Sequence, residues 1–331
     1  MKNYCQGVSV VVVSYNAKNH VLDCLASLTL APPICEIIVV DNASTDGTTQ
    51  AVSTEYPNVR LLSNQKNQGF PKAINFGVAE AISDTILVLD SDVIVDSNTI
   101  SRLYDEIRAH PGVVGPAVFN GNSLEPDSGS NLDLMLLPKA NSVLGKALFV
   151  QGCCFMTTRS CFESVGGYDE RYFLVFDDVE YCWQVLRHGY DVRVVESVKI
   201  WHKGGTSNPG GYQQGHDLHT TVRRILLRER NSYIMLIACA PLKHVAWLLP
   251  LSLLRTVIFT AFLLYHQKIG AAFILWRDIW KTVFMLPGTI SRRKRAEQCG
   301  KTASQEGWVR LERRLYLLDH LRDEVKLVMA D

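Results

Sequence analysis

The sequence predicts an α/β fold with a largely parallel sheet, followed by a helical C-terminal region. Up to about residue 120, short β-branched runs alternate with segments whose apolar residues recur at helical spacing, which is typical of β-α-β units. After about residue 232 the composition becomes apolar and basic. We therefore expect an α/β domain over residues 1–230 and a helical, membrane-associating region over residues 231–331.

Each element is predicted from its own pattern. Apolar, β-branched runs predict buried strands at residues 8–13, 36–40, 59–62 and 85–89. Helical spacing predicts helices around residues 21–28 and 100–107, and Pro71 suits the first position of another. Further along, the patterns predict a long loop, a strand, a helix and a strand at residues 120–148, 149–157, 177–188 and 198–201, respectively.

Composition and charge narrow the possible partners. Hydrophobic residues make up 47% of the 331 residues, which excludes a disordered chain. Residues 1–222 hold 15 Lys and Arg against 24 Asp and Glu, a charge of −9, and the remainder carries +10, so that the total is +1. The acidic part suits a cation site, and the basic part suits an anionic membrane surface. No nucleic-acid-binding motif is present, so we expect no nucleic acid partner.

The cysteines and the N-terminus indicate that the first domain is cytosolic. None of the nine cysteines forms a C-x-x-C pair, and most lie in apolar runs, so we expect small buried side chains in a reducing compartment. The run at residues 8–13 is too short for a signal peptide and is better explained as a strand.

The C-terminal region has features of a membrane-surface segment. Residues 245–265 are nearly long enough to span a bilayer, but Arg255 near their centre would cost about 2.5–3.5 kcal/mol. Residues 269–286 resemble a helix lying in the interface, and the basic residues 292–295 would attract anionic headgroups. We expect peripheral or re-entrant association with the cytoplasmic face of the plasma membrane; the alternative is a soluble helical subdomain.

Three predicted strands end in polar residues, at 14–16, 41–47 and 90–92. Ligands bind beyond the carboxyl ends of the strands in such sheets, so we expect these residues to meet at one site. The two carboxylates of Asp90-Ser91-Asp92 suit a hard divalent cation. Asp41 can accept a hydrogen bond from the imide N–H of uracil or thymine. Turn and capping roles are the alternative, which we expect for Ser44 and Asp46.

Two later features add to this site. Asp177, Asp178 and Glu180 gather at a helix start, where acids stabilise the helix dipole, but three exceed that need and suggest a general base. His202 follows a predicted strand and is a candidate metal ligand beside Asp92, although a lone histidine is more often structural.

Taken in order, these segments resemble family 2 glycosyltransferases with the GT-A fold over roughly residues 7–230, and are most similar to bacterial rhamnosyltransferase-like enzymes of surface-polysaccharide assembly. The motifs that carry the resemblance lie at residues 12–16, 39–47, 67–70, 75–77, 89–92, 166–170, 177–180 and 201–202.

The resemblance implies a role for each site residue. Asp178 aligns with the catalytic base, and Gly152 and Asp177 with the sugar and acceptor side. Asp92 would hold Mg²⁺ or Mn²⁺, with His202 joining it. Donor binding falls to Ser14, Asn16, Asp41, Gly69, Asp90 and Ser91, with Asp41 on the pyrimidine and Asp90 near the ribose. Gln184 stands where the family often has an arginine, with Arg187 one turn later.

The expected function is inverting, metal-dependent transfer of a sugar from a nucleoside-diphosphate donor to a hydroxyl of a glycan or polyprenyl-linked glycan. dTDP-rhamnose is the first choice of donor, and UDP-hexoses are the alternative. A processive synthase fits less well, because His188 follows Gln184-Val185-Leu186-Arg187 where such enzymes carry Trp. A dehydrogenase would need a G-x-G-x-x-G after the first strand, which is absent. A non-enzymatic alternative is an inactive sugar-nucleotide-binding membrane scaffold.

Overall fold

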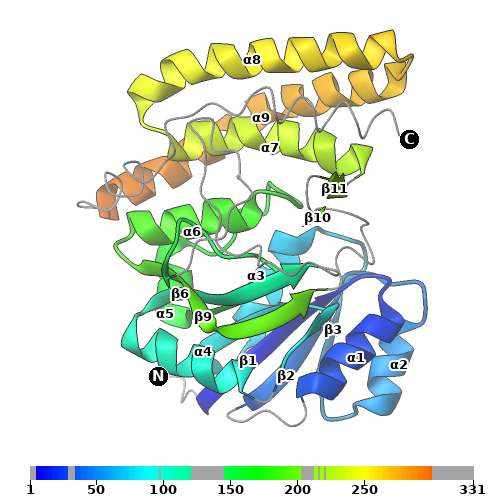
Figure 1. The fold of residues 1–331 in the computed structure, drawn as a ribbon, viewed down its shortest axis with the longest axis vertical. Coiled ribbons are helices and arrows are strands. Elements are labelled where there is room, and N and C mark those ends of the chain that lie inside the picture. Colours follow the sequence, from blue (N-terminus) through cyan, green and yellow to red (C-terminus); the bar gives the residue numbers. More distant parts are fainter. Residues whose placement is uncertain are drawn as a thin grey trace.

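The computed structural model describes residues 5–28, 34–96, 98–120, 145–202, 212–214, 217–219 and 221–299. Most of the predicted long loop, residues 121–144, lies outside these ranges. Figure 1 shows an α/β domain with three long helices stacked above it.

The main sheet of the described residues is mixed and mostly parallel, as the sequence predicts. Its strand order is β3-β2-β1-β4-β8-β6-β9-β5, with β7 also paired to β9. The strands β1, β2, β3 and β4 are parallel neighbours, whereas β8 runs antiparallel between β4 and β6. The strands are β1 (Cys5–Ser14), β2 (Ile34–Asp41), β3 (Arg60–Ser63), β4 (Ser83–Asp90), β5 (Val93–Ile94), β6 (Gly112–Asn120), β7 (Gly145–Lys146), β8 (Cys154–Thr158) and β9 (Asp191–His202), with β10 (Tyr212–Gln214) and β11 (Asp217–His219) forming a separate hairpin.

Alternating side chains of β1 show why the sheet is covered on both faces. Val8, Val10 and Val12 belong to one hydrophobic core, and Val11 and Val13 belong to the other. Helices α1, α2 and α4 pack on the first face, and α3, α5 and α6 pack on the second. These helices are α1 (Lys18–Leu28), α2 (Thr48–Glu55), α3 (Phe70–Glu80), α4 (Thr99–Ala109), α5 (Arg159–Val165) and α6 (Asp177–Arg187).

The predicted strand at residues 149–157 is wrong in its first half. β8 begins only at Cys154, because residues 151–153 form a turn. This turn joins two parts of the molecule: the carbonyl of Cys153 accepts a hydrogen bond from the Asp90 N–H at 2.8 Å, and the Gly152 N–H points to α6.

Six cysteines are free and buried, as expected of small apolar residues: Cys24, Cys153, Cys154, Cys161, Cys182 and Cys239. Cys35 departs from that expectation, because it is disulfide-bonded.

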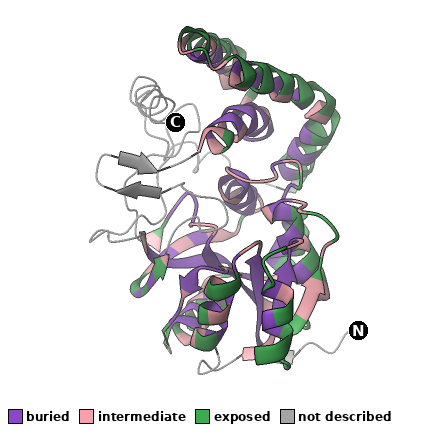
Figure 2. Ribbon diagram, turned by 90° about the vertical axis from the view of Figure 1, so that its right-hand side faces the viewer, coloured by how far each residue is buried: buried purple, intermediate pink, exposed green. Residues whose placement is uncertain are grey.

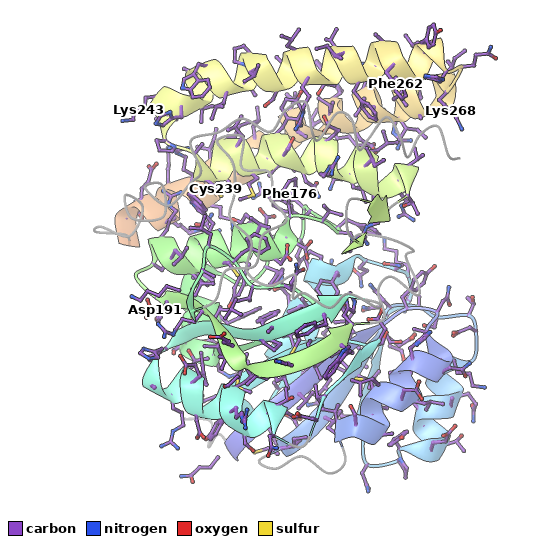
Figure 3. All side chains as sticks on the ribbon, in the orientation of Figure 1. Phe176, Asp191, Cys239, Lys243, Phe262 and Lys268 are labelled. Carbon is purple, nitrogen blue, oxygen red and sulfur yellow. The ribbon has the colours of Figure 1, made fainter. Side chains whose placement is uncertain are left out.

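Three helices complete the described chain: α7 (Val222–Cys239), α8 (Leu242–Tyr265) and α9 (Ile269–Cys299). Residue 230, the predicted end of the α/β domain, lies inside α7. The layer between α7 and the α/β domain contains Phe176 and Cys239, whereas Lys243 and Lys268 lie at the two ends of α8 (Figure 3). A small core between the three helices includes Tyr233 and Phe259.

The charged residues of these helices are used differently from what the sequence suggests. Arg255 forms an ion pair at 3.0 Å with Glu229 of α7, and both side chains are buried. The expected headgroup cluster at residues 292–295 is wrong for Arg292 and Arg293, which are buried against the protein, whereas Lys294 and Arg295 are exposed. Sequence shows that charges are adjacent along a helix, but not which of them point inward.

The outer faces of α8 and α9 are exposed, as the outer edge of Figure 2 shows, and they carry large apolar side chains. Large exposed side chains there include Tyr265, Phe273, Trp280 and Phe284. Within the described residues, α8 is the one helix that is long and apolar enough to cross a bilayer, with a mean hydropathy of 1.9.

Candidate active site

The register of the parallel strands brings the predicted polar ends together. Ser14 pairs with Asp41, and Val13 pairs with Asp90. The carboxyl ends of β2, β1 and β4 therefore lie side by side, and the three polar segments predicted to converge do so.

Asp41 and Ser14 each present an unsatisfied buried oxygen at this edge. The side chain of Asp41 is 1% exposed, and its Oδ2 accepts a hydrogen bond at 2.9 Å from the Ser44 N–H. Its Oδ1 and the Ser14 hydroxyl have no hydrogen-bond partner among the described residues. An orphaned buried acceptor is costly unless a ligand satisfies it. Asp41 thus has one oxygen for the turn and one available to a bound molecule.

The neighbouring polar residues support the loop. Asn16 adopts a left-handed conformation (φ 48°), and its Oδ1 accepts a hydrogen bond at 2.8 Å from the Thr45 N–H. The Ser44 hydroxyl accepts from the Asn16 N–H, and Asp46 accepts from the N–H of Thr48. The turn and capping roles expected for Ser44 and Asp46 are confirmed, and the Asn16 amide oxygen serves the same loop.

Gly69 lies against the backbone that leads to α6. A Cβ at this position would stand 2.6 Å from the carbonyl oxygen of Phe173, and Gly69 has a left-handed φ of 88°. The next residue, Phe70, donates its N–H to that carbonyl at 2.8 Å. Only glycine fits here, and the contact joins the start of α3 to the segment before Asp177.

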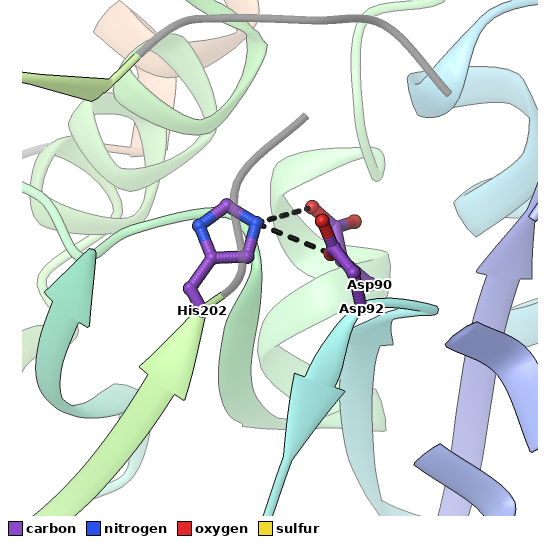
Figure 4. A group of neighbouring side chains, drawn as sticks. All are labelled: Asp90, Asp92 and His202. Carbon is purple, nitrogen blue, oxygen red and sulfur yellow. Dashed lines mark ion pairs between the residues drawn. The ribbon is translucent and has the colours of Figure 1, made fainter. Parts of the chain in front are cut away.

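Asp90, Asp92 and His202 form a cluster that could hold a metal ion (Figure 4). Strand β5 pairs antiparallel with β9 so that Val93 lies opposite His202, which brings the imidazole to Asp92. His202 Nε2 is 3.2 Å from Asp92 Oδ1 and 3.9 Å from Asp90 Oδ2. Ser91, between the two aspartates, is buried.

The chemistry of this donor set suits a divalent cation. One ligand atom from each side chain lies within 4.8 Å of the others, and two carboxylates with an imidazole suit Mg²⁺ or Mn²⁺. Desolvation and the Asp92 carboxylate raise the pKa of Asp90 to about 7. Although burial opposes it, the hydrogen bond from His202 lowers the pKa of Asp92, and Asp92 raises the pKa of His202. Two neighbouring carboxyl groups such as those of Asp90 and Asp92 tend to share a proton, unless a bound cation supplies the positive charge instead.

Asp177 and Asp178 begin α6 beside this cluster. The Gly152 N–H donates to Asp178 Oδ2 at 3.1 Å, while the adjacent Cys153 carbonyl accepts from the Asp90 N–H. Consecutive residues of this turn thus connect the predicted base to the end of β4 at Asp90. A Cβ on Gly152 would stand 3.2 Å from Asp178 Cβ, so a larger residue would crowd the carboxylate. Burial raises the pKa of both Asp177 and Asp178.

Sequence reasoning missed Arg224, the third residue of α7. Burial lowers its pKa, and the carboxylates of Asp177, Asp90 and Asp178 oppose that shift, so its guanidinium lies in the field of the acidic site. In the sequence, the adjacent Arg223 and Arg224 look like ordinary solvent-exposed charges, and no local pattern shows that Arg224 lies at the site. Gln184 and Arg187 are engaged elsewhere, with Glu180 at 2.7 Å and with the Ala238 carbonyl at 3.0 Å.

A mixed, mostly parallel sheet with this acidic site at its strand ends is the arrangement of the GT-A fold. The model of the family described as glycosyl transferase family 2 matches residues 9–166. Over those residues, just under half of its length, the chain resembles this family, and it is similar to bacterial rhamnosyltransferases.

Two relatives and one solved structure illustrate the similarity. An N-acetylglucosaminyl-diphospho-decaprenol L-rhamnosyltransferase of Mycobacterium tuberculosis is 28% identical over 263 residues, covering 67% of this chain and 84% of that protein. The dTDP-rhamnosyl transferase RfbF of Shigella flexneri is 25% identical over 238 residues, covering 69% and 79%. The mannosyltransferase PcManGT from Pyrobaculum calidifontis, in complex with GDP-Man and Mn²⁺, shares the fold with a TM-score of 0.51 and 17% identity, covering 88% and 86%.

Proposed function

We propose that this glycosyltransferase moves rhamnose from dTDP-rhamnose to a hydroxyl of a lipid-linked glycan, with inversion at the anomeric carbon and with a divalent cation. The observation that carries the proposal is the convergence of the Asp90, Asp92 and His202 cluster with Asp178, joined through the 152–153 turn. A GT-A transferase needs these two groups on opposite sides of the sugar.

The donor's base is assigned to Asp41. Its unsatisfied Oδ1 suits the imide N–H of a pyrimidine, and the Ser14 hydroxyl beside it offers a further polar contact. Thymine and uracil both carry that N–H, so this contact selects pyrimidines rather than rhamnose. The choice of dTDP-rhamnose is supported by the name of the Shigella relative, a dTDP-rhamnosyl transferase.

Asp92 and His202 would hold the cation, with Asp90 beside them near the ribose. When bound, the cation would act as a Lewis acid that neutralises negative charge on the departing diphosphate. Arg224 contributes fixed positive charge to the same pocket.

Asp178 is the proposed general base. Two backbone N–H groups, of Gly152 and Val179, bind its two oxygens at 3.1 and 2.8 Å, which fixes the carboxylate at the edge of the site. It removes the proton of the acceptor hydroxyl as that oxygen attacks the anomeric carbon. A single displacement of this kind inverts the anomeric centre and requires no covalent nucleophile.

The acceptor is proposed to be a polyprenyl-linked glycan at the cytoplasmic face of the membrane. The exposed apolar faces of α8 and α9 support this proposal, as does the lipid-linked substrate in the name of the Mycobacterium relative. Peripheral docking is favoured over spanning, because crossing would separate Arg255 from Glu229.

The test is nucleoside-diphosphate release by the purified full chain from a panel of nucleotide sugars with Mn²⁺ or Mg²⁺, with and without EDTA. We expect one preferred donor, dTDP-rhamnose, whose slow hydrolysis stops with EDTA. Preference for a UDP-hexose would change the proposed donor but leave the proposed reaction unchanged. Because release can require the acceptor, calorimetry of donor binding is run beside it, and neither release nor metal-dependent binding for any donor would indicate an inactive scaffold.

A further inference from the structure

The segment that leads into α6, the helix that begins with Asp177 and Asp178, is held in an unfavourable backbone conformation. Phe173, Val175 and Phe176 all have left-handed φ angles, of 65°, 70° and 68°. Such angles are costly for bulky residues and above all for a β-branched one. They persist only where surrounding contacts enforce them, and they occur here directly before Asp177 and Asp178.

Helix α7 supplies contacts that enforce this conformation. The fully buried Asn231 donates from Nδ2 toward the carbonyls of Leu174 and Val175 at 2.8 and 2.7 Å, with that of Tyr172 at 3.2 Å. Its neighbour Arg230 donates from Nη2 to the Tyr172 carbonyl at 2.6 Å. These side chains satisfy carbonyls that the irregular segment cannot pair within itself.

Helix α9 holds the first turn of α6 from another direction. Arg292 binds Glu180 through two bonds, from Nε to Oε1 at 2.7 Å and from Nη2 to Oε2 at 3.0 Å. Its Nη2 also donates to the Gly167 carbonyl at 2.8 Å. Both charged groups are buried, and Glu180 lies one turn after Asp177, so this bidentate pair fixes the start of α6.

We propose that Asn231 and Arg292 are positioning residues for Asp178, and that α7 and α9 form a clamp on residues 172–180. The inference rests on the proposed role of Asp178 as base. Both residues lie outside the family match at residues 9–166, in helices whose composition suggests only membrane association. A displacement of about 1 Å at a reacting group can cost on the order of 10²-fold in rate, so holding the base is a catalytic requirement.

The experiment compares Asn231→Ala and Arg292→Gln with the control Arg293→Gln. Arg293 is the adjacent arginine of α9 and is also largely buried, but it donates to the carbonyls of Ile237 and Ala240 and not to residues 172–180. For the two clamp variants we expect kcat to fall roughly 10- to 100-fold, with donor affinity within about threefold of wild type. The acid limb of the pH profile should also move, because the carboxylate leaves the Gly152 N–H. Arg293→Gln should change kcat less than about threefold.

Two further measurements keep the test decisive. Arg292→Lys retains the charge but not the bidentate geometry and should give an intermediate kcat with full donor binding. Hydrogen exchange across residues 172–180 should accelerate in the clamp variants alone, and it needs no activity. A wild-type chain without turnover or binding contradicts the proposed function. Unchanged hydrogen exchange in the clamp variants overturns the clamp. So does a loss of kcat that only matches the loss of protein able to bind donor, with a pH profile like that of the wild type.

Discussion

Asp41 and Asp178 are both held by backbone N–H groups, but they differ in what remains available. Asp41 uses one oxygen in its turn and keeps a buried oxygen without a partner among the described residues. Asp178 uses both oxygens on N–H groups and lies at an edge that is only partly buried. The first arrangement suits binding of a donor group, and the second suits a fixed base.

Asp178→Asn should lower kcat by about 10²- to 10⁴-fold, because an amide cannot accept the acceptor's proton. Burial raises the pKa of Asp178 above the ordinary 3.8, with the N–H groups of Val179 and Gly152 partly offsetting this. Since the base acts deprotonated, wild-type kcat/KM should decline as the pH falls through a value above 3.8. A pH-rate series on both proteins checks this, and full activity in the variant would sink the base assignment.

Asp41→Ala should weaken donor binding and leave metal binding intact. The loss of a hydrogen bond to a charged acceptor corresponds to about 1.5–3 kcal/mol, or roughly 10- to 150-fold in affinity. Calorimetry with a pyrimidine nucleoside diphosphate measures it, and Asp46→Ala, in the same loop, is the control with a capping role only. Equal losses in the two variants would indicate a loop effect rather than base recognition.

Which residues of the site could be predicted depends on how they are brought together. Asp41, Asp90 and Ser14 follow from parallel pairing, because adjacent strand ends meet without any knowledge of tertiary packing. Arg224, Asn231 and Arg292 reach the site region from helices packed on the domain, and no local pattern specifies that packing.

At the scale of elements, α8 has two different faces, one packed against α7 and one exposed. Its inner face carries Arg255 and Thr256 toward Glu229 and Tyr233 of α7, and its outer face is apolar. Hydropathy along the sequence detects the apolar face, but it cannot reveal that the central arginine has a buried partner. Periodicity likewise predicts most helices and strands, whereas the turn that shortens β8 depends on Gly152 meeting Asp178.

Removing one partner of the buried pair should destabilise the helical region. Arg255→Met leaves Glu229 uncompensated, and we expect a loss of about 3–5 kcal/mol in the free energy of unfolding. The double change Glu229→Gln with Arg255→Met should recover most of it. Chemical denaturation in detergent measures the stability of both variants. Arg277→Met is the control, because the Arg277 side chain that pairs with Asp278 is exposed to solvent. A single variant as stable as the control would contradict the structural role of the pair.

At the scale of the whole molecule, apolar and basic surface coincide on the helical side of the enzyme. Large exposed side chains of α9, including Trp280 (66% exposed) and Phe284 (76%), accompany the exposed Arg277 and Lys281. Such a face suits the interfacial zone of an anionic leaflet. Its composition was predictable, but the inward direction of Arg292 and Arg293 was not.

Replacing Trp280 and Phe284 with Ser should reduce binding of the full chain to anionic vesicles by roughly tenfold or more, since large apolar side chains would leave the bilayer. Donor hydrolysis in solution should be unchanged. Vesicle co-sedimentation measures the binding, and Phe76→Ser, an exposed aromatic on α3, is the control. Undiminished binding would remove this face from the membrane contact.

The pairing of β5 with β9 also has a consequence for biogenesis. Asp92 leaves the ribosome long before His202, and α9, whose Arg292 binds Glu180, is made later still. A nascent chain can therefore form its first parallel strands early, but it gains the acidic pocket only after β9 is made, and the Arg292 contact with Glu180 only after α9 is made. A fragment that ends before α9 lacks the Arg292–Glu180 pair, and we expect such a fragment to be inactive.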